Sequence, residues 1–256
     1  RSQQVFAFMD VVARVKPRAF VMENVKALYN NRRFKRAREL LSRRAAELGY
    51  TTRSLLLNAS HFGVPQARER MFFIGLKPGM RWQDPTPSSA DDPPTVRVAL
   101  RRLPRFMAFG NDNACSAKIT LALQPVLRKS AHAGMLFNGQ GRPLALDRPA
   151  LTLPATMGGN RTPIVDQRCI DDPTATSWVE LYHANLMAGG APGGSVPVDL
   201  RRITVQEAAA LQTFPPDTQW HGPQSAQYRQ IGNAVPPVLG YAVAQALRQA
   251  LQSGTT

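Results

Sequence analysis

The chain has 256 residues, of which 43% are hydrophobic and 19% are charged. This composition fits one large domain or two modest ones and excludes a highly charged, weakly hydrophobic disordered chain. Two cysteines cannot form a disulfide framework, and no close pairing of Cys or His residues indicates zinc. No apolar run approaches the ~20 residues of a membrane helix. We therefore expect no bound metal, no membrane partner and a cytoplasmic setting.

Charge gives the first positive indication of function. The chain carries 32 basic and 17 acidic residues, and 26 of the basic residues are arginine. Arginine binds phosphate with two parallel hydrogen bonds, so the charge predicts a polyanionic partner such as nucleic acid. A ribosomal-type protein, or a GC-rich genome that uses arginine for lysine, is the alternative. The excess is uneven, because residues 1–105 hold 21 basic and 8 acidic residues.

The first 77 residues alternate between predicted helices and predicted strands. Apolar residues at helical spacing predict helices over 3–15 and 31–48, the second ended by Gly49. Short apolar runs predict strands over 19–25, 51–58 and 70–76. This alternation is typical of an α/β domain with a largely parallel sheet.

The middle of the chain is irregular and the end is helical. Residues 78–98 predict a linker or long loop, and the glycine clusters that follow predict a loop-rich second domain ending near residue 200. From residue 201, Thr204 and Glu207 form a capping box ahead of an alanine-rich helix. A last helix begins after Pro236–Pro237. It should return to the first sheet and bury Val238, Leu239, Ala242, Val243, Ala246, Leu247 and Leu251.

Polar residues in the first domain are candidates for chemistry. Glu23 and Asn24 end a predicted strand, where α/β proteins bind ligands, although a helix cap is an equal alternative. Gln66, Arg68 and Arg70 alternate, so an extended chain would place them on one face. Arg70 enters an apolar strand and needs a partner such as Glu23 or a ligand oxygen. The alternative is an exposed edge strand with a row of solvated arginines.

A third candidate lies in the segment QYRQIGNAVPP at 227–237. Gly232 gives backbone room, and Asn233 offers an amide just before the last helix. The amino end of a helix favours polar or anionic ligand groups. A plain turn into the helix is the alternative.

Taken together, five segments resemble the later motifs of the C5-cytosine DNA methyltransferases, in that family's order. They are ENV at 23–25, VPQARER at 64–70, RPALTLPA at 148–155, RRITVQEAAALQTFP at 201–215 and QYRQIGNAVPP at 227–237. The resemblance runs from about residue 1 to residue 247. It implies an α/β fold: part of the Rossmann-like sheet of the S-adenosylmethionine (SAM) methyltransferases over 1–77 and 201–256, with a smaller, loop-rich target-recognition domain over 78–200.

The resemblance also implies roles for individual residues. Glu23 would hold a flipped cytosine at N3 and its amino group, with Asn24 shaping the pocket. Arg70 would donate to the cytosine O2, and Arg68 would order the pocket. SAM would be the cofactor, with its pocket wall formed by Asn233 and Gly232.

Double-stranded DNA is the partner that the resemblance implies, in the nucleoid of a prokaryote or a phage-infected cell. RPALTLPA would brace the recognition domain. Gln140 would fill the hole left by the flipped base. The residues expected to enter the DNA groove lie on two glycine-containing loops: Asn138, Gln140 and Arg142 on the first, and Gly158, Gly159, Asn160 and Arg161 on the second.

Two features of the family are missing from the sequence. Its Pro-Cys nucleophile loop and its SAM-binding glycine loop have no counterpart, since Cys115 follows Ala114 and Cys169 follows Arg168. The sequence opens at Arg1 in an apolar periodic segment. We therefore expect an incomplete fragment or split subunit, inactive alone, that works with an amino-terminal methyltransferase fragment. Its partial sheet would expose a strand edge and favour association.

Other readings stay open at the level of sequence. A non-catalytic DNA-binding or regulatory protein could have kept the scaffold and lost the nucleophile. RNA methylation by a relative is less favoured, because a recognition region of roughly 120 residues suits duplex DNA. We expect the arginines of the helix over 31–48 to form a solvated outer face rather than a DNA contact.

Overall fold

The computed structural model describes residues 2–254, which fall into two units. The first unit takes in Arg1–Phe62, Arg68–Ala90 and Val238–Thr256, and the second takes in Gly63–Ala67 and Asp91–Pro237. Arg1, at which the sequence opens, lies outside the described residues. These boundaries differ from the predicted domains, because residues 78–90 lie in the first unit and 201–237 in the second. The second unit holds the larger part of the chain.

The sheet of the first unit has three strands in the order β1 (Ala19–Val25), β4 (Glu69–Leu76) and β2 (Thr51–Asn58). The central strand β4 runs antiparallel to both neighbours. The prediction of a largely parallel sheet is therefore wrong. A parallel neighbour needs a long crossover, usually a helix, whereas the chain between β2 and β4 contains only the short turn η2 (Ala59–Phe62) and the two-residue strand β3 (Gln66–Ala67).

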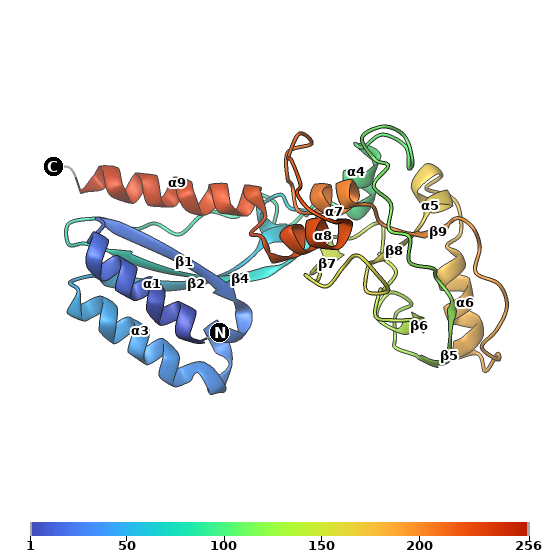
Figure 1. The fold of residues 1–256 in the computed structure, drawn as a ribbon, viewed down its shortest axis with the longest axis horizontal. Coiled ribbons are helices and arrows are strands. Elements are labelled where there is room, and N and C mark those ends of the chain that lie inside the picture. The colour runs from blue at the N-terminus through green and yellow to red at the C-terminus, as the bar shows by residue number, and fades with distance from the viewer. Residues whose placement is uncertain (1, 255–256) are drawn as a thin grey trace. The chain divides into compact units, whose positions relative to one another are not determined.

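Helices cover both faces of this sheet (Figure 1). On one face lie α1 (Ser2–Val15) and α3 (Lys35–Glu47), and on the other lies α9 (Pro237–Ser253). The predicted helix over 31–48 is interrupted, with η1 (Arg32–Phe34) ahead of α3. The reason is Asn31, whose side chain accepts a hydrogen bond from the Arg33 backbone and so caps a separate turn. A further short helix, α2 (Lys26–Asn30), follows β1.

The core of the first unit lies between the sheet and α1 and α3. Met9, Leu41 and Phe73 are fully buried there. Phe20 stacks edge-on against Tyr50 with ring centroids 5.1 Å apart. Gly75 makes room for it, since an added Cβ would stand 2.1 Å from the Phe20 ring.

The last helix packs as an amphipathic element of the first unit. Its buried residues are Leu239, Val243, Ala246 and Ala250. Val238, expected in the core, is 39% exposed because it lies in the first turn and off that face. At the other end of α9, Arg18 donates to the carbonyls of Leu251 and Gly254.

The second unit contains short strands joined by long loops. Strand β3 pairs in parallel with β7 (Ala150–Leu151), and β8 (Ile164–Asp166) pairs antiparallel with β9 (Leu200–Arg202). Strand β5 (Leu121–Val126) pairs with β6 (Met135–Phe137). The helices of this unit are α4 (Val96–Arg101), α5 (Gln167–Asp171), α6 (Trp178–Met187), α7 (Val205–Leu211) and α8 (Gln224–Asn233).

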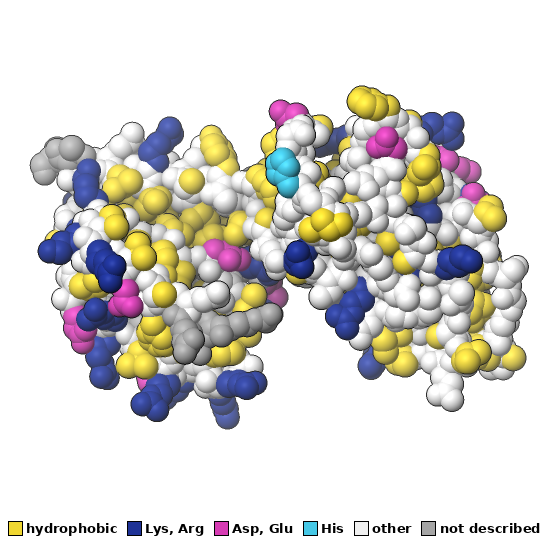
Figure 2. All heavy atoms as spheres, viewed as in Figure 1, with side chains coloured by type: hydrophobic (Ala, Val, Ile, Leu, Met, Phe, Trp, Pro, Cys, Tyr) yellow, Lys and Arg dark blue, Asp and Glu magenta, His cyan; other side chains and the backbone are white. Residues whose placement is uncertain are grey.

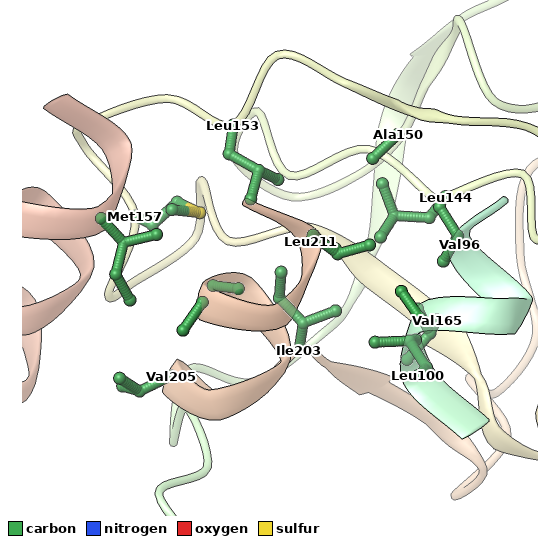
Figure 3. Packing of buried hydrophobic residues seen from close by; sticks show 14 of the residues in the cluster. Val96, Leu100, Leu144, Ala150, Leu153, Met157, Val165, Ile203, Val205 and Leu211 are labelled. Atoms are coloured by element: carbon green, nitrogen blue, oxygen red, sulfur yellow. The ribbon is translucent and has the colours of Figure 1, made fainter. Parts of the chain in front are cut away.

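Two apolar clusters hold these pieces together. One packs α4, α5, α7 and α8 with β8 (Figure 3), and the other packs β6 and α6 with β9. Figure 3 shows Leu100 of α4, Val165 of β8 and Leu211 of α7 converging on the same core. The predicted capping box of α7 is confirmed, because Thr204 and Glu207 exchange two hydrogen bonds of 2.9 Å. Among the described residues, no helix combines the length and apolar character needed to cross a bilayer.

Candidate active site and nucleic-acid surface

Neighbouring strands of the first unit bring a carboxylate and a guanidinium together. In the antiparallel register of β1 and β4, Glu23 lies opposite Phe72 and Val25 lies opposite Arg70, so Glu23 and Arg70 are diagonal neighbours on one face. Arg70 Nε lies 2.9 Å from Glu23 Oε1, and the two side chains are 12% and 29% exposed. The predicted contact of Arg70 with Glu23 is confirmed.

Burial and charge act in opposite directions on this pair. Burial raises the pKa of Glu23, while the guanidiniums of Arg70 and Arg68 pull it down and only partly offset that effect. Burial also lowers the pKa of Arg70 against the attraction of Glu23. Arg68 has its pKa lowered to about 10 by burial, with repulsion from Arg70 adding to the shift. The site therefore holds a carboxyl that takes up a proton more readily than an ordinary glutamate, next to two cations.

Asn24 and Arg68 lie beside this pair. The Asn24 side chain accepts a hydrogen bond of 2.9 Å from the Val25 backbone, which fixes the turn out of β1. Arg68 is completely buried, and its carbonyl accepts from the Ala59 backbone at 2.9 Å. These contacts position both residues at the end of β1 and the start of β4, and their roles toward a ligand stay predictions.

Gln66 does not share a face with the two arginines as the alternation predicted. Its side chain is buried in the second unit, where it accepts from the Leu153 backbone at 3.1 Å and donates to the Leu211 carbonyl at 3.5 Å. The physical reason is a change of pairing partner at Arg68, since β3 pairs with β7 and β4 pairs with β1 and β2. The prediction assumed one continuous strand, whereas β3 ends at Ala67 and β4 begins at Glu69.

Gly232 and Asn233 end α8, and they differ in what surrounds them. A Cβ on Gly232 would stand 2.6 Å from the Ala155 Cα and 2.7 Å from the Pro154 carbonyl oxygen. The room that this glycine gives is thus taken up by protein backbone, within the RPALTLPA segment. Asn233 is exposed, so its amide is available to a ligand. Of the two, only Asn233 presents a group that could hold part of a cofactor.

The two glycine-containing loops pack against each other in the second unit. The backbone N–H groups of Gln140 and Gly141 both donate to the Asn160 carbonyl, at 3.2 and 2.8 Å. Gly139 adopts φ +72°, and a Cβ there would stand 2.4 Å from the Asn160 Cβ. The loops predicted to contact DNA therefore form one joint surface.

Arg202 braces this joint surface from within, and the sequence analysis missed it. It is 2% exposed, and its guanidinium donates to the Thr162 carbonyl at 2.7 Å and to the Ala117 carbonyl at 3.0 Å. A Cβ on Gly141 would stand 2.5 Å from Arg202 Nη1. Arg202 ends strand β9 and precedes the buried Ile203. The argument used for Arg70, that a buried guanidinium needs hydrogen-bond partners, therefore applies to Arg202 as well.

A groove of about 410 Å³ runs along these loops, lined in part by Gln140, Arg142 and Arg161 together with Thr152 and Thr156. The two arginines and Gln140 are exposed. Such a lining offers the cations, amide and hydroxyls that contact phosphates and base edges.

Other residues expected to enter DNA have structural contacts. Asn138 accepts from the Thr120 backbone at 3.0 Å and donates to the Lys118 carbonyl at 3.3 Å. Gly158 has φ +99°, and a Cβ there would stand 2.8 Å from the Ser225 Cα. Around Gly159, by contrast, an added Cβ would meet nothing within 4 Å. Asn160 is exposed at its side chain.

Both cysteines lie in the second unit. Burial raises the pKa of the Cys169 thiol to about 11, far from the depressed values of reactive thiols. The Cys115 sulfur lies 3.5 Å from the Thr162 hydroxyl, inside the loop structure. Over residues 2–254, no group of three or more His, Cys, Asp or Glu side chains could hold a metal ion.

The chain has a mixed α/β fold that is similar to the folds of solved methyltransferases. The chain matches the family model of the C-5 cytosine-specific DNA methylases over residues 1–249 and belongs to that family.

Individual relatives agree with this assignment. The chain is 32% identical over 249 residues to the Type II methyltransferase M1.HphI of Haemophilus parahaemolyticus, covering 94% of this chain and 59% of that protein. It is 29% identical over 247 residues to the Type II methyltransferase M.AplI of Arthrospira platensis, covering 96% and 61%. Among proteins of known structure, the S. pombe Dnmt2 methyltransferase superposes with a TM-score of 0.64 at 18% identity, covering 97% of this chain and 71% of that one. The chain thus spans about three fifths of the length of these two Type II relatives.

Proposed function

We propose that this chain carries the cytosine-binding and DNA-contacting parts of a DNA (cytosine-5-)-methyltransferase. The reaction would transfer a methyl group from SAM to C5 of a cytosine flipped out of duplex DNA. The observation that carries the proposal is the half-buried pair of Glu23 and Arg70, 2.9 Å apart on adjacent strands. Family membership over residues 1–249 supports the choice of reaction.

The chemistry of cytosine explains why such a pair is useful. C5 is a poor nucleophile and gains electron density only after a thiolate adds to C6. A proton or hydrogen bond at N3 makes that addition easier. Burial raises the pKa of Glu23, so its carboxyl holds such a proton more readily than an ordinary glutamate does. Arg70 uses Nε for Glu23 and Nη1 for the Glu69 carbonyl, and its Nη2 would donate to the cytosine O2.

SAM would supply the methyl group when bound. In this chain the exposed amide of Asn233 suits a hydrogen bond to the cofactor. Gly232 serves the packing of α8 against the Pro154–Ala155 backbone, so its contribution to the cofactor pocket is to set the position of Asn233.

Duplex DNA would bind the joint surface of the two loops. Arg142 and Arg161 would contact phosphates or base edges, and Gln140 would occupy the space of the flipped base. Flipping costs a few kcal/mol, which contacts of this kind offset. Asn138 and Gly158 would hold the loops in shape through their own contacts. Binding of this kind would place the protein on the nucleoid.

We further propose that the 256-residue chain does not transfer a methyl group alone. The reaction needs a thiolate at C6, and the surroundings of Cys115 and Cys169 fit structural thiols. The thiolate would come from an amino-terminal methyltransferase fragment or subunit that carries a Pro-Cys loop. The same observation favours a second candidate, a non-catalytic DNA-binding protein on this scaffold.

Labelled methyl transfer from SAM to duplex DNA tests these proposals. We expect no turnover with the chain alone and turnover when a family polypeptide carrying the Pro-Cys loop is added. Glu23→Gln should abolish the restored turnover. Arg53→Ala should not, because it breaks only the exposed ion pair between Arg53 of strand β2 and Asp84. Turnover by the chain alone would refute the dependence on a partner, and full activity of Glu23→Gln would refute the role of Glu23. DNA binding without turnover in any combination would favour the second candidate.

A further inference from the structure

The outer face of α3 carries a dense group of cations. We define the α3 surface as Arg32, Arg33, Lys35, Arg36 and Arg43, all of them exposed. Together with Glu39 and Leu40 they line a groove of about 590 Å³. Figure 2 shows Lys and Arg side chains gathered along the side of the first unit where Figure 1 draws α3.

Two other arginines of the same helix, Arg38 and Arg44, have structural partners. Arg38 donates to the carbonyls of Leu28 and Asn31, both at 3.0 Å. Arg44 faces the carboxylates of Asp10 and Glu47 at 3.9 and 3.7 Å. These contacts hold α3 in the fold, so the helix does not need the arginines on its outer face for packing.

The α3 surface is therefore close to unneutralised. One carboxylate in the groove lining, that of Glu39, lies 3.8 Å from Lys35. Among the described residues, no carboxylate lies within 4 Å of Arg32, Arg33, Arg36 or Arg43. Like charges one turn apart destabilise a helix by a few tenths of a kcal/mol per pair. An anionic partner that binds these cations would remove the repulsion between them.

The spacing of the arginines suits a phosphate backbone. Arg36 and Arg43 are seven residues apart on one helix, which places their Cα atoms about 10 Å apart along its axis. Successive phosphates of one DNA strand are separated by ~3.4 Å along the duplex axis, so this separation spans about three of them. Guanidinium groups bind phosphate oxygens with paired hydrogen bonds. Leu40 is the single apolar member of the groove lining, which leaves little to insert into a lipid surface.

We propose that the α3 surface binds the sugar-phosphate backbone of duplex DNA, independently of base sequence. This contact is additional to the groove of the recognition loops and does not depend on methyl transfer. It would lengthen the time that the protein spends on DNA outside its target sites. It differs from the sequence-based expectation, in which this face is only solvated.

The test compares two double variants of the full chain that lose the same charge. Arg36→Gln with Arg43→Gln alters the α3 surface, and Arg14→Gln with Arg248→Gln removes two exposed arginines from α1 and α9. Glutamine has a helix propensity close to that of arginine, so the substitutions should preserve the helices. Circular dichroism with thermal unfolding checks that both variants fold. Binding to a fluorescent duplex of A·T pairs alone is followed by anisotropy over a range of salt concentrations. No SAM is present, and the duplex contains no cytosine.

We expect the α3 variant to lose about two units of the slope of log K against log salt, since each phosphate contact contributes ~0.9. The control variant should lose less than half a unit. Equal slopes for the two variants would overturn the proposal, as would failure of the unaltered chain to bind this duplex. A preference of the α3 surface for tRNA, or for phosphatidylserine vesicles, would overturn the choice of DNA. None of these outcomes affects the methyl-transfer assay, so the two proposals fail separately.

Discussion

Replacing Arg202 by alanine should destabilise the second unit more than any substitution on its surface. Two short hydrogen bonds, of 2.7 Å to Thr162 and 3.0 Å to Ala117, would be lost from a side chain that is 2% exposed. A buried carbonyl left without a donor costs about 1–3 kcal/mol. Adding the space that the guanidinium leaves, we expect a loss of about 3–5 kcal/mol in the free energy of unfolding.

Urea unfolding measures this loss when it is followed by the fluorescence of Trp178 and Trp220, which both lie in the second unit. A Trp82→Phe background removes the signal of the first unit. Hydrogen exchange of the Gly141 amide, which donates to Asn160 within the braced loops, gives a local readout. Arg142→Ala is the matched control, because this arginine is exposed and should change stability by about 0.5 kcal/mol or less. A cost below about 1 kcal/mol for Arg202→Ala, with unchanged exchange at Gly141, would refute the reasoning.

Three further outcomes follow from the structure. Gly232→Ala should cost about 1–3 kcal/mol in urea unfolding, because its Cβ would stand 2.6 Å from backbone, whereas Gly159→Ala, with open space around it, should be nearly neutral. Burial raises the pKa of the Cys169 thiol from 9.0 to about 11, so the unfolded chain loses this proton at lower pH than the folded chain does. The free energy of unfolding should therefore fall as pH rises through that interval. Iodoacetamide should label the folded thiol only slowly near pH 8. Burial raises the pKa of Glu23 above 4.5, so its contribution to stability should be greatest below that pH and decline as pH rises through the folded value. Glu23→Gln should remove this dependence, and a constant difference in urea midpoint between the two proteins across that range would contradict it.

Local patterns in the sequence predicted several elements correctly. The end of α3 follows from Gly49, which adopts φ +76° as a left-handed stop after the helix. The capping box of α7 depends on residues three apart and needs no knowledge of the rest of the fold. The contact of Arg70 with Glu23 followed from the cost of burying an unpaired guanidinium.

Long-range pairing was beyond the same reasoning. Periodicity does not show which strand lies beside which, so the antiparallel position of β4 was missed. Gln66 was misplaced because β3 and β4 pair with different partners on either side of Arg68. Gly232 was interpreted by its freedom of conformation, whereas its neighbours are 77 residues away in sequence at Ala155. Local sequence patterns do not predict contacts between residues so far apart in the chain.

The five residues from Gly63 to Ala67 have a consequence for how this protein can be divided. They lie between Phe62 and Arg68 of the first unit, yet their strand and the Gln66 amide complete the second. A polypeptide cut at 91–237 would lose the two hydrogen bonds that the Gln66 side chain makes with the Leu153 N–H and the Leu211 carbonyl. Exchange of the second unit between relatives, in the laboratory or in evolution, would therefore have to transfer this short segment together with the long one.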